Sequence, residues 1–520
     1  MPSSGKIRAA AGYSAVFCIS VFAWLASAGC NTTPAGRRST AAGPVTLTIG
    51  FPNFTGQDPL RGIQQAARLI SLEGLVGLSR DGHAAPRLAE RWKVSDDGLA
   101  WTIQLRENVF FHDDSPVTSV SVKESLQRSL ANADRDLSPG LADISDIETA
   151  GDFTLIIHLH NRSTFLLDDL TVPITKIGTG GAMLGTGPYA IENASENQIV
   201  MRAFQRYYRG KPSIERVVWK PYSTVRTAWA AMMRGDVDFL YEVGQDAREF
   251  IQAENSVRTF PFLRNYVYAV IPNSKNGSLR DPRIRRALNY AVNRESLVEG
   301  AFKGQARPAA GSAWPEHWAF DASLAEYSYQ PSKASALLDA AGVPTRTSSI
   351  GGPPGRLHFT CIFPENLPLW ERMALLVQRD LAQIGVDMQL QALPIDEFNK
   401  RLESGNFDAV LLELIIGNGA SRPFTFWYSQ SKRNAWGYNN ARLDRALDGI
   451  RRASNDTDYR SAFRQFQIEA FDDPPAIFLA LAERARAVSR RFEVVAPPNS
   501  DILPTIGDWR LARDASRDSN

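Results

Sequence analysis

Cysteine is scarce in this sequence, since its 520 residues include only Cys18, Cys30 and Cys361. Three cysteines cannot form a disulfide framework, so the fold does not depend on one. An excess of charge of either sign is also missing, because 58 Lys and Arg face 56 Asp and Glu. Such a chain lacks the broad basic surface that non-specific nucleic-acid binding needs. We therefore expect no nucleic-acid partner.

Motifs of nucleotide chemistry and hydrolysis are absent too. Gly-Lys occurs twice, followed by Ile and by Pro, so there is no P-loop, and G-x-G-x-x-G, G-x-S-x-G and H-E-x-x-H do not occur. Only His158 and His160 cluster among the six histidines, and a metal site needs three or four ligands. The sequence therefore predicts no catalytic residue, metal site or cofactor, and a protein that is not an enzyme.

The N-terminus has the features of a secretory signal. Lys6 and Arg8 precede the apolar stretch 9–28, and small residues lead to Cys30. Ala28-Gly29 before Cys30 resembles a bacterial lipobox without its usual Leu, whereas Ala26-Ser27-Ala28 is an A-x-A cleavage site; an uncleaved anchor is a third alternative. We predict a signal peptide over 1–29, a lipid at Cys30, and export to the periplasm or cell surface. A protein free in the periplasm is the alternative.

The rest of the chain alternates strands and helices. Residues 30–44 read as a flexible tether, and 45–51 as a strand followed by a helix at 64–75. No fixed-period repeat is present. Alternation of this kind predicts α/β lobes. It continues at 101–105, 122–130, 154–159, 198–203, 217–220, 227–234, 266–271, 284–292, 357–363, 369–384, 387–393, 395–402, 409–414 and 476–481.

Two local features allow more than one interpretation. Residues 178–188 contain five glycines, which favours a hinge or mobile loop over a backbone cradle for an anion. Cys361 lies in an apolar run, which favours a small buried hydrophobe over a reactive thiol.

A series of short blocks resembles a known family. The blocks are 86–92 (PRLAERW), 95–98, 105–106, 111–117 (FHDDSPV), 185–189 (GTGPY), 206–208, 235–238, 281–295 (DPRIRRALNYAVNRE), 334–342 and 406–409. In this order they are similar to the family 5 extracytoplasmic solute-binding proteins of ABC importers, the peptide/nickel type. The similarity covers about residues 45 to 510.

This resemblance implies an α/β, two-lobe periplasmic-binding-protein fold (type II) with an additional inserted α/β domain. The implied first lobe is discontinuous, over 45–75, 180–261 and 485–515. The inserted domain covers 76–179, and the second lobe covers 262–484. It also implies a monomer that captures a peptide-like or other oligomeric solute between two lobes and delivers it to an ABC permease. A sensor or scaffold of the same fold is the alternative, as is a binder of an oligosaccharide, a metal chelate or an anion.

The sequence departs from the family at one place. Peptide-binding members usually carry an acidic residue after the block matching 406–409, where it pairs with the ligand's ammonium group. Here no Asp or Glu follows Glu413 up to Trp427, so another acid acts or the ligand is not an ordinary free peptide. Arg422 points to an anionic or carbonyl-rich ligand, with a structural ion pair as the alternative.

Four segments are expected to converge on the binding cleft. Aromatic rings would hold apolar or planar parts of the solute, and amides would satisfy its polar edges. The candidate residues are Phe51, Asn53 and Phe54; Thr186 and Tyr189; Asn265 and Tyr266; and Asn418, Arg422 and Trp427.

Overall fold

The computed structural model describes residues 43–52, 59–131, 138–244, 247–252, 254–275, 277–309, 311–324, 326–344 and 356–512. The signal segment, Cys30 and two candidate site residues, Asn53 and Phe54, lie outside the described residues. Residues 44–520 form one unit by their contacts, and the description below concerns that unit. Within its described part, no helix combines the length and the apolar character that crossing a membrane requires.

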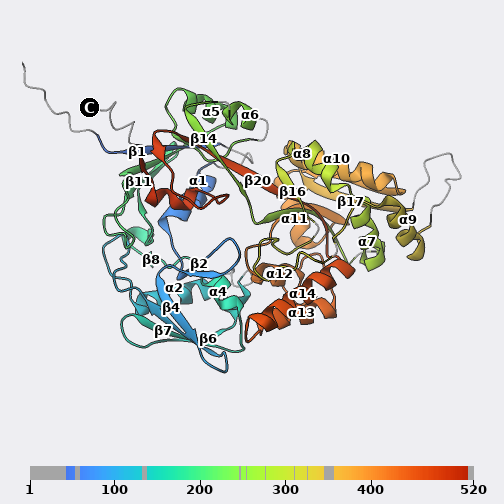
Figure 1. Cartoon of the computed structure of the whole chain (residues 1–520), viewed down its shortest axis with the longest axis horizontal. Coiled ribbons are helices and arrows are strands. Elements are labelled where there is room, and N and C mark those ends of the chain that lie inside the picture. Colours follow the sequence, from blue (N-terminus) through green and yellow to red (C-terminus); the bar gives the residue numbers. More distant parts are fainter. Residues whose placement is uncertain are drawn as a thin grey trace, which may run out of the picture. The chain divides into compact units, whose positions relative to one another are not determined.

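A first group of elements surrounds a core that includes Trp219, Phe239 and Trp509. We call it the first lobe, and Figure 1 shows it in blue, green and red. Its elements are β1 (Thr46–Pro52), α1 (Pro59–Ser71), β10 (Tyr189–Ser195), β11 (Gln198–Ala203), β12 (Arg216–Tyr222), α5 (Val225–Met233), β13 (Phe239–Leu240), α6 (Arg248–Gln252), β14 (Val257–Leu263), β21 (Phe492–Glu493), η5 (Leu503–Asp508) and β22 (Arg510–Leu511).

A second group, called here the inserted domain, has its own apolar core. Its four-stranded antiparallel sheet has the order β4-β5-β7-β6, and α2 packs on it through Val122 and Leu126. Its elements are β2 (Val76–Leu78), β3 (Ala84–Pro86), β4 (Ala89–Val94), β5 (Ala100–Leu105), α2 (Ser119–Ala131), α3 (Pro139–Ala142), β6 (Ile144–Thr149), β7 (Thr154–Leu159), α4 (Phe165–Asp169), β8 (Lys176–Ile177), η2 (Thr179–Gly181) and β9 (Met183–Leu184).

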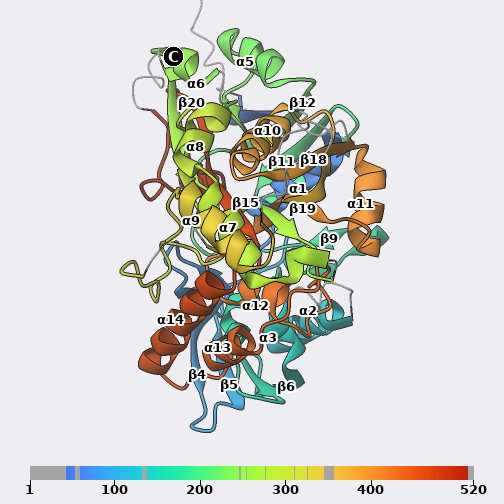
Figure 2. The same cartoon turned by 90° about the vertical axis from the view of Figure 1, so that its right-hand side faces the viewer.

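The third group is called the second lobe. Helices α13 and α14 pack side by side in it, as Figure 2 shows. Its elements are β15 (Tyr266–Pro272), η4 (Gly277–Arg280), α7 (Pro282–Ala291), α8 (Arg294–Phe302), β16 (Ala306–Pro308), α9 (Pro331–Ala340), β17 (Leu357–Pro364), α10 (Pro368–Ala382), β18 (Val386–Leu393), α11 (Ile395–Ser404), β19 (Ala409–Ile415), α12 (Ser421–Trp427), α13 (Ala441–Arg451) and α14 (Asp456–Asp472).

One long strand, β20 (Ile477–Ser489), belongs to both lobes (Figure 1). Its residues 477–482 pair with β15 and β16 of the second lobe. Its residues 483–489 pair with β14 of the first lobe, and β13 joins at 487–488. The strands of both lobes thereby form one sheet, with the main order β10-β11-β12-β1-β13-β20-β15-β19-β17-β18. The strand predicted at 476–481 therefore ends too early. The apolar run stops there, but β20 continues to Ser489 through Arg484 to Ala487, where arginine and alanine alternate.

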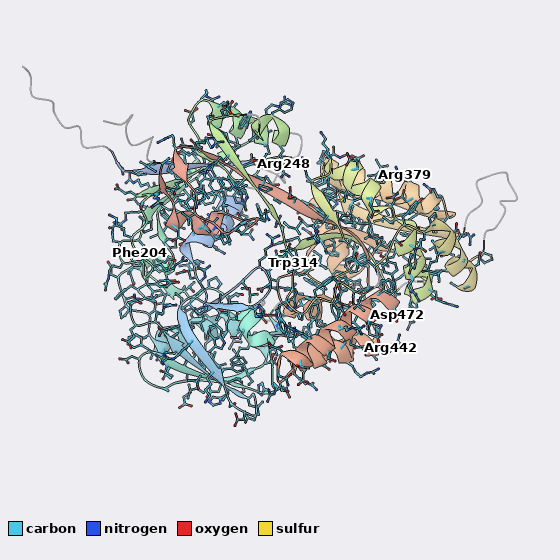
Figure 3. All side chains as sticks on the ribbon, viewed as in Figure 1. Phe204, Arg248, Trp314, Arg379, Arg442 and Asp472 are labelled. Atoms are coloured by element: carbon cyan, nitrogen blue, oxygen red, sulfur yellow. The ribbon has the colours of Figure 1, made fainter. Side chains whose placement is uncertain are left out.

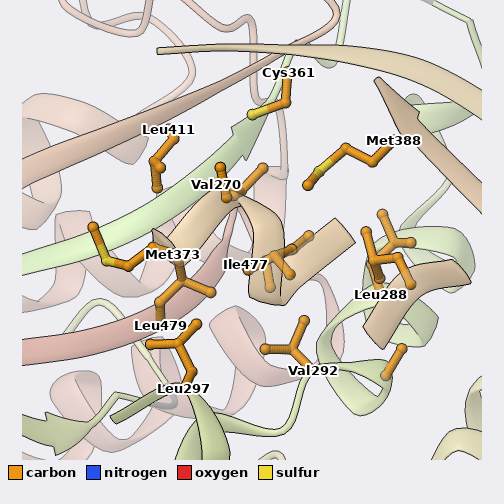
Figure 4. Packing of buried hydrophobic residues seen from close by; sticks show 14 of the residues in the cluster. Val270, Leu288, Val292, Leu297, Cys361, Met373, Met388, Leu411, Ile477 and Leu479 are labelled. Carbon is orange, nitrogen blue, oxygen red and sulfur yellow. The ribbon is translucent and has the colours of Figure 1, made fainter. Parts of the chain in front are cut away.

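The second-lobe core confirms the interpretation of Cys361 as a buried small hydrophobe. Figure 4 shows Cys361 among Val270, Met388 and Leu411, and the side chain is 1 % exposed. Burial raises the pKa of its thiol to about 12, so the thiolate that would react is disfavoured.

Two close approaches of the backbone explain part of the glycine-rich segment. A Cβ at Gly185 would lie 2.2 Å from the carbonyl oxygen of Ser71, and one at Gly187 would lie 2.7 Å from that of Ile70. Both glycines thus let the returning chain pack on the end of α1. Gly180 and Gly181 have φ of 74° and 80° in an exposed turn between β8 and β9.

The inserted domain is joined to the second lobe beside α4. The amide of Thr164 donates to the carbonyl oxygen of Arg451 at 2.7 Å, and the Phe165 ring lies 5.4 Å from that of Phe424. Arg451 also forms an ion pair with Asp143. Polar and apolar contacts therefore hold these two groups together.

Candidate functional site

A cleft with a volume of about 470 Å³ lies where the first lobe, the inserted domain and the second lobe meet. This size falls within the range of small-molecule sites. The first lobe and the second half of β20 supply most of its walls. The lining residues are Leu69, Tyr241, Glu242, Phe262, Leu263, Arg484, Arg486, Asn499, Ser500, Asp501 and Pro504; Leu78 and Arg80; and Arg264, Asn265, Tyr266, Trp314 and Asn418.

Strand β20 places two arginines in the cleft because side chains alternate along a strand. Ala485 and Ala487 are buried in the apolar cluster that includes Val237 and Leu240. Arg484 and Arg486 lie in the alternate positions, and both line the cleft. One face of this half of the strand therefore packs on the apolar cluster, and the other face carries the two arginines into the cleft.

Arg484 joins acidic side chains from both lobes. Its guanidinium donates to Glu242 of the first lobe at 2.5 Å and to Glu413 of β19 at 3.4 Å. It also donates to the Tyr268 hydroxyl at 3.2 Å. Burial alone would lower the pKa of Arg484, but the negative charges of Glu242 and Glu413 outweigh it and leave that pKa raised.

Arg486 is held in a fixed orientation. Its Nε and Nη2 donate to the two carboxylate oxygens of Asp501, at 3.0 and 2.7 Å. Its guanidinium also lies 4.0 Å from the centre of the Tyr241 ring. A bidentate pair of this kind fixes the positions of both charges.

Arg264 is less enclosed than the two arginines of β20. Its guanidinium lies 4.0 Å from the centre of the Tyr266 ring and 3.6 Å from a carboxylate oxygen of Glu413. Its side chain is 32 % exposed, against 6 % for Arg486. Arg264 therefore offers a flat cationic surface that a solute can reach.

Asn265 and Asn418 connect the second lobe to the inserted domain. The Asn265 side-chain amide donates to the Asn418 side-chain oxygen at 3.0 Å, and the Asn418 amide donates to the carbonyl oxygen of Ser79 at 3.1 Å. The carbonyl oxygen of Asn265 also accepts from the amide of Ile416 at 2.9 Å. The structure thus brings together three of the predicted residues, Asn265, Tyr266 and Asn418, in one wall.

Arg80, in the turn between β2 and β3, links all three groups of elements. It pairs with Glu316 of the second lobe, with 2.7 Å between Nη2 and Oε1, and donates to the carbonyl oxygen of Asn499. The indole of Trp314, labelled in Figure 3, donates to the carbonyl oxygen of Arg80 at 2.8 Å. The pKa of Glu316 is lowered, first by the hydrogen bond from Arg80.

Four other candidate residues are buried away from the lining. Phe51 packs in the first-lobe core and lies 4.5 Å from the Tyr241 ring. Tyr189 donates to the carbonyl oxygen of Ile214 at 3.1 Å, and Thr186 donates to Glu73 at 3.2 Å. Trp427 packs with Trp436 in the second-lobe core. These side chains have structural contacts and do not line the cleft.

Arg422, in α12, lies near the contact between the inserted domain and the second lobe. Its positive charge acts on Asp168 and Asp169, two carboxyl groups at the end of α4. Burial, the largest effect, raises the pKa of both groups to about 7, and Arg422 opposes that rise. The side chain does not line the cleft.

Sequence reasoning missed all six charged residues that line the cleft. They are Arg80, Glu242, Arg264, Arg484, Arg486 and Asp501. One signal was available, because Arg484 to Ala487 alternates arginine and alanine, as a strand with two different faces does. The partners of Arg484 and Arg486 depend on the sheet topology, which the sequence alone does not specify.

The fold and this cleft define a two-lobe solute-binding protein of α/β architecture. Residues 83–436 match the family model described as "Bacterial extracellular solute-binding proteins, family 5 Middle". This match covers well over half of the chain. The chain belongs to the bacterial extracellular solute-binding proteins, family 5, as its sequence blocks led us to expect.

Characterised relatives agree with this assignment. The glutathione-binding protein GsiB of Salmonella typhimurium is 26 % identical over 499 residues, which cover 90 % of this chain and 94 % of GsiB. Two solved structures show the same two-lobe fold. NikZ from Campylobacter jejuni, in complex with Ni(L-His), has a TM-score of 0.75 and 22 % identity and covers 90 % of this chain and 99 % of NikZ. NikA from Brucella suis, in complex with Fe(III)-EDTA, has a TM-score of 0.78 and 19 % identity and covers 89 % and 100 %.

Proposed function

We propose that this protein captures a small, carboxylate-bearing solute in the cleft and delivers it to an ABC importer permease. The observation that carries the proposal is the charge of the lining, in which four arginines face two carboxylates among the described residues. Arginine binds carboxylates well because its planar fork matches their two oxygens.

Acidic side chains in the cleft are already paired. Glu242 pairs with Arg484, and Asp501 pairs with Arg486. A free ammonium group would have to compete with these arginines for a carboxylate. Arg264, which is 32 % exposed and lies 3.6 Å from Glu413, can instead meet a negative group of the solute, so an anion suits this cleft better than a cation.

The names and bound molecules of the relatives also support a carboxylate-bearing solute. Glutathione, Ni(L-His) and Fe(III)-EDTA all contain carboxylate groups, and GsiB, NikZ and NikA are named or solved with them. A peptide-like molecule or a metal chelate is therefore the solute class that we propose for this chain. We also propose that it acts as a monomer outside the cytoplasm, attached to a membrane by a lipid at Cys30, and that it catalyses no reaction.

A solute screen by thermal unfolding tests this proposal on the mature protein. The set contains reduced glutathione, nickel–histidine, iron–EDTA, trialanine and the neutral sugar maltotriose. We expect at least one carboxylate-bearing compound, and not maltotriose, to raise the melting temperature, because a ligand that binds only the folded state stabilises it. Stabilisation by maltotriose alone would contradict the proposal.

The matched variants are Arg264→Ala and Arg234→Ala. Arg264→Ala should weaken binding of the stabilising compound about 10- to 150-fold, the range for hydrogen bonds to charged groups. Arg234 is an exposed arginine that pairs with Asp236 on the surface, so its loss should leave the affinity unchanged. Titration calorimetry measures both affinities. Equal affinity in Arg264→Ala would remove Arg264 from the binding site.

A further inference from the structure

A second cavity, called here the arginine pocket, lies between the inserted domain and the first lobe. Its volume is about 380 Å³. The inserted domain supplies four of its lining residues, and the loop between β11 and β12 of the first lobe supplies two. They are Ala85, Pro86, Arg87 and Arg106, and Tyr208 and Arg209. None of them lines the solute cleft, so the two cavities are separate.

The charge of the arginine pocket is of one sign. Three of its lining residues are arginines, and no acidic residue of the described part of the chain lines it. The solute cleft differs, because two carboxylates line it together with its arginines. The arginine pocket therefore presents only positive side chains to a ligand.

The ion pairs of these three arginines are few and loose. Arg106 forms no ion pair within the described residues, and its Nε donates to the carbonyl oxygen of Arg87 at 2.7 Å. Nη1 of Arg87 lies 4.0 Å from a carboxylate oxygen of Glu73, and Nη2 of Arg209 lies 3.3 Å from one of Asp508. A guanidinium has five N–H donors, so each of the three keeps donors for a ligand.

Tyr208 lies close to all three arginines. The guanidinium carbon of Arg106 is 5.7 Å from the centre of the Tyr208 ring. Burial, and then the charge of Glu73, raise the pKa of the Tyr208 hydroxyl to about 12, and the charges of Arg87 and Arg209 oppose that rise. The three guanidinium groups therefore surround one side chain and can act together on one ligand.

A ligand can reach these groups from solvent. The side chains of Arg87 and Arg209 are 39 % and 44 % exposed. Glu73, the carboxylate beside Arg87, is largely buried and does not line the pocket. Both guanidinium groups are therefore available without any opening of the fold.

We propose that the arginine pocket is a second binding site, for a phosphate group that carries two negative charges. The planar forks of the three arginines match the oxygens of such a group, and their charges together exceed that of a single anion. Inorganic phosphate and the headgroup of phosphatidic acid both supply this chemistry. The proposal is independent of the solute that the cleft binds.

Titration calorimetry of the mature protein with inorganic phosphate, at pH 8 and constant ionic strength, tests the site. We expect a dissociation constant below about 1 mM for phosphate, and binding at least about tenfold weaker for nitrate, an oxyanion with one charge. Absence of phosphate binding at about 10 mM, or equal affinity for nitrate, would overturn the proposal.

Two variants each remove one guanidinium group from the pocket. Arg106→Gln and Arg209→Gln should each weaken phosphate about 10- to 150-fold, the range for hydrogen bonds to charged groups. Arg234→Gln is the control, because Arg234 pairs with Asp236 on the surface, and it should leave the affinity unchanged. Circular dichroism checks folding. If Arg106→Gln fails to fold, the exposed Arg209 provides the test, and unchanged affinity in the folded variants would overturn the proposal.

The arginines of the solute cleft offer a competing location for the anion. Arg264→Ala, which should weaken the cleft solute, should leave phosphate binding unchanged. Phosphate binding that is lost in Arg264→Ala and kept in Arg106→Gln would place the anion in the cleft and would overturn the proposal.

Vesicles identify the source of the phosphate group. Phosphatidylcholine vesicles with and without phosphatidic acid are sedimented with Cys30→Ser protein, which cannot carry the proposed lipid. Sedimentation that requires both phosphatidic acid and Arg106 supports the site with a lipid headgroup as its ligand. Phosphate binding in calorimetry without such sedimentation supports the site with the soluble ion as its ligand.

Discussion

Arg484 donates a hydrogen bond of 2.5 Å to Glu242, and both side chains line the cleft between the lobes. Arg484 lies in β20, which pairs with strands of both lobes. The contact with Glu242 is therefore located where the two lobes are joined. The side chains are 21 % and 14 % exposed, so water screens the pair less than it screens a surface pair.

Glu242→Gln should lower the free energy of unfolding by about 1–3 kcal/mol, because it removes one charge partner of a largely buried guanidinium and leaves only Glu413. Urea unfolding of the empty protein measures this loss. Glu192→Gln is the control, because Glu192 pairs with Arg216 at 3.3 Å on the surface and should contribute no more than about 1 kcal/mol. Equal losses in the two variants would show that the Arg484 pair adds nothing beyond a surface contact.

Asp169 should make stability depend on pH. Burial, and then the charge of Asp168, raises its pKa from 3.8 to about 7, so the folded state favours the protonated form. The resulting stabilisation is complete below about pH 4 and is lost as the pH rises through about 7. Wild-type protein should therefore lose more stability than Asp169→Asn between pH 5 and pH 8, by on the order of 1–3 kcal/mol.

Urea unfolding at the two pH values measures that difference. The Asn side chain keeps an oxygen that can accept the amide of Gly140, which lies 2.7 Å from Asp169. Asp236→Asn, at an exposed position, is the control and should follow the wild type. Parallel pH profiles for wild type and Asp169→Asn would contradict the expectation.

Arg422→Ala should act on stability, because Arg422 opposes the charge of Asp168 and Asp169. We expect a loss of about 1–3 kcal/mol at pH 8, and a smaller loss at pH 5, where these carboxyl groups are protonated. Solute affinity should change little. A large loss of affinity with an unchanged melting temperature would instead assign Arg422 to solute binding.

Cys30→Ser should abolish lipid attachment. In a bacterial host the wild-type chain should incorporate radiolabelled palmitate and stay with the membrane fraction, whereas the variant should lose both properties. Cys361→Ser, a substitution in the second-lobe core, is the control for labelling of another thiol and should keep the label. Unchanged labelling of Cys30→Ser would exclude the lipid, and a mature N-terminus at Gly29 would favour A-x-A cleavage.

Much of the fold follows from periodicity in the sequence. The elements predicted at 154–159 and 198–203 have the same bounds as β7 and β11. The helix predicted at 64–75 is α1, which begins at Pro59 and ends at Ser71. Leu75 fits the helical spacing, but it packs in the core of the inserted domain. An apolar residue in the sequence pattern thus predicts that its side chain is buried. It does not predict which of the cores the side chain joins.

The site was less predictable than the fold. Three cleft residues could be predicted because they lie near strand ends, where ligands often bind. Asn265 precedes β15, Tyr266 is its first residue and Asn418 follows β19. Trp427 follows the same reasoning and is instead in the core, because large rings contribute most when fully buried. Arg484 and Arg486 of β20 can be recognised as cleft residues only once their ion-pair partners are known. These partners, Glu242 and Asp501, come from other parts of the chain.

The pairing of β20 with both lobes also limits how such a protein can be rearranged. A genetic exchange that replaced the first lobe with a foreign one would have to divide this strand near residue 482 and keep its register on both sides. A cut there would break the continuous backbone that carries strand pairing from one lobe to the other. The shared strand therefore makes a change of specificity more accessible through side chains of the cleft than through the exchange of whole lobes.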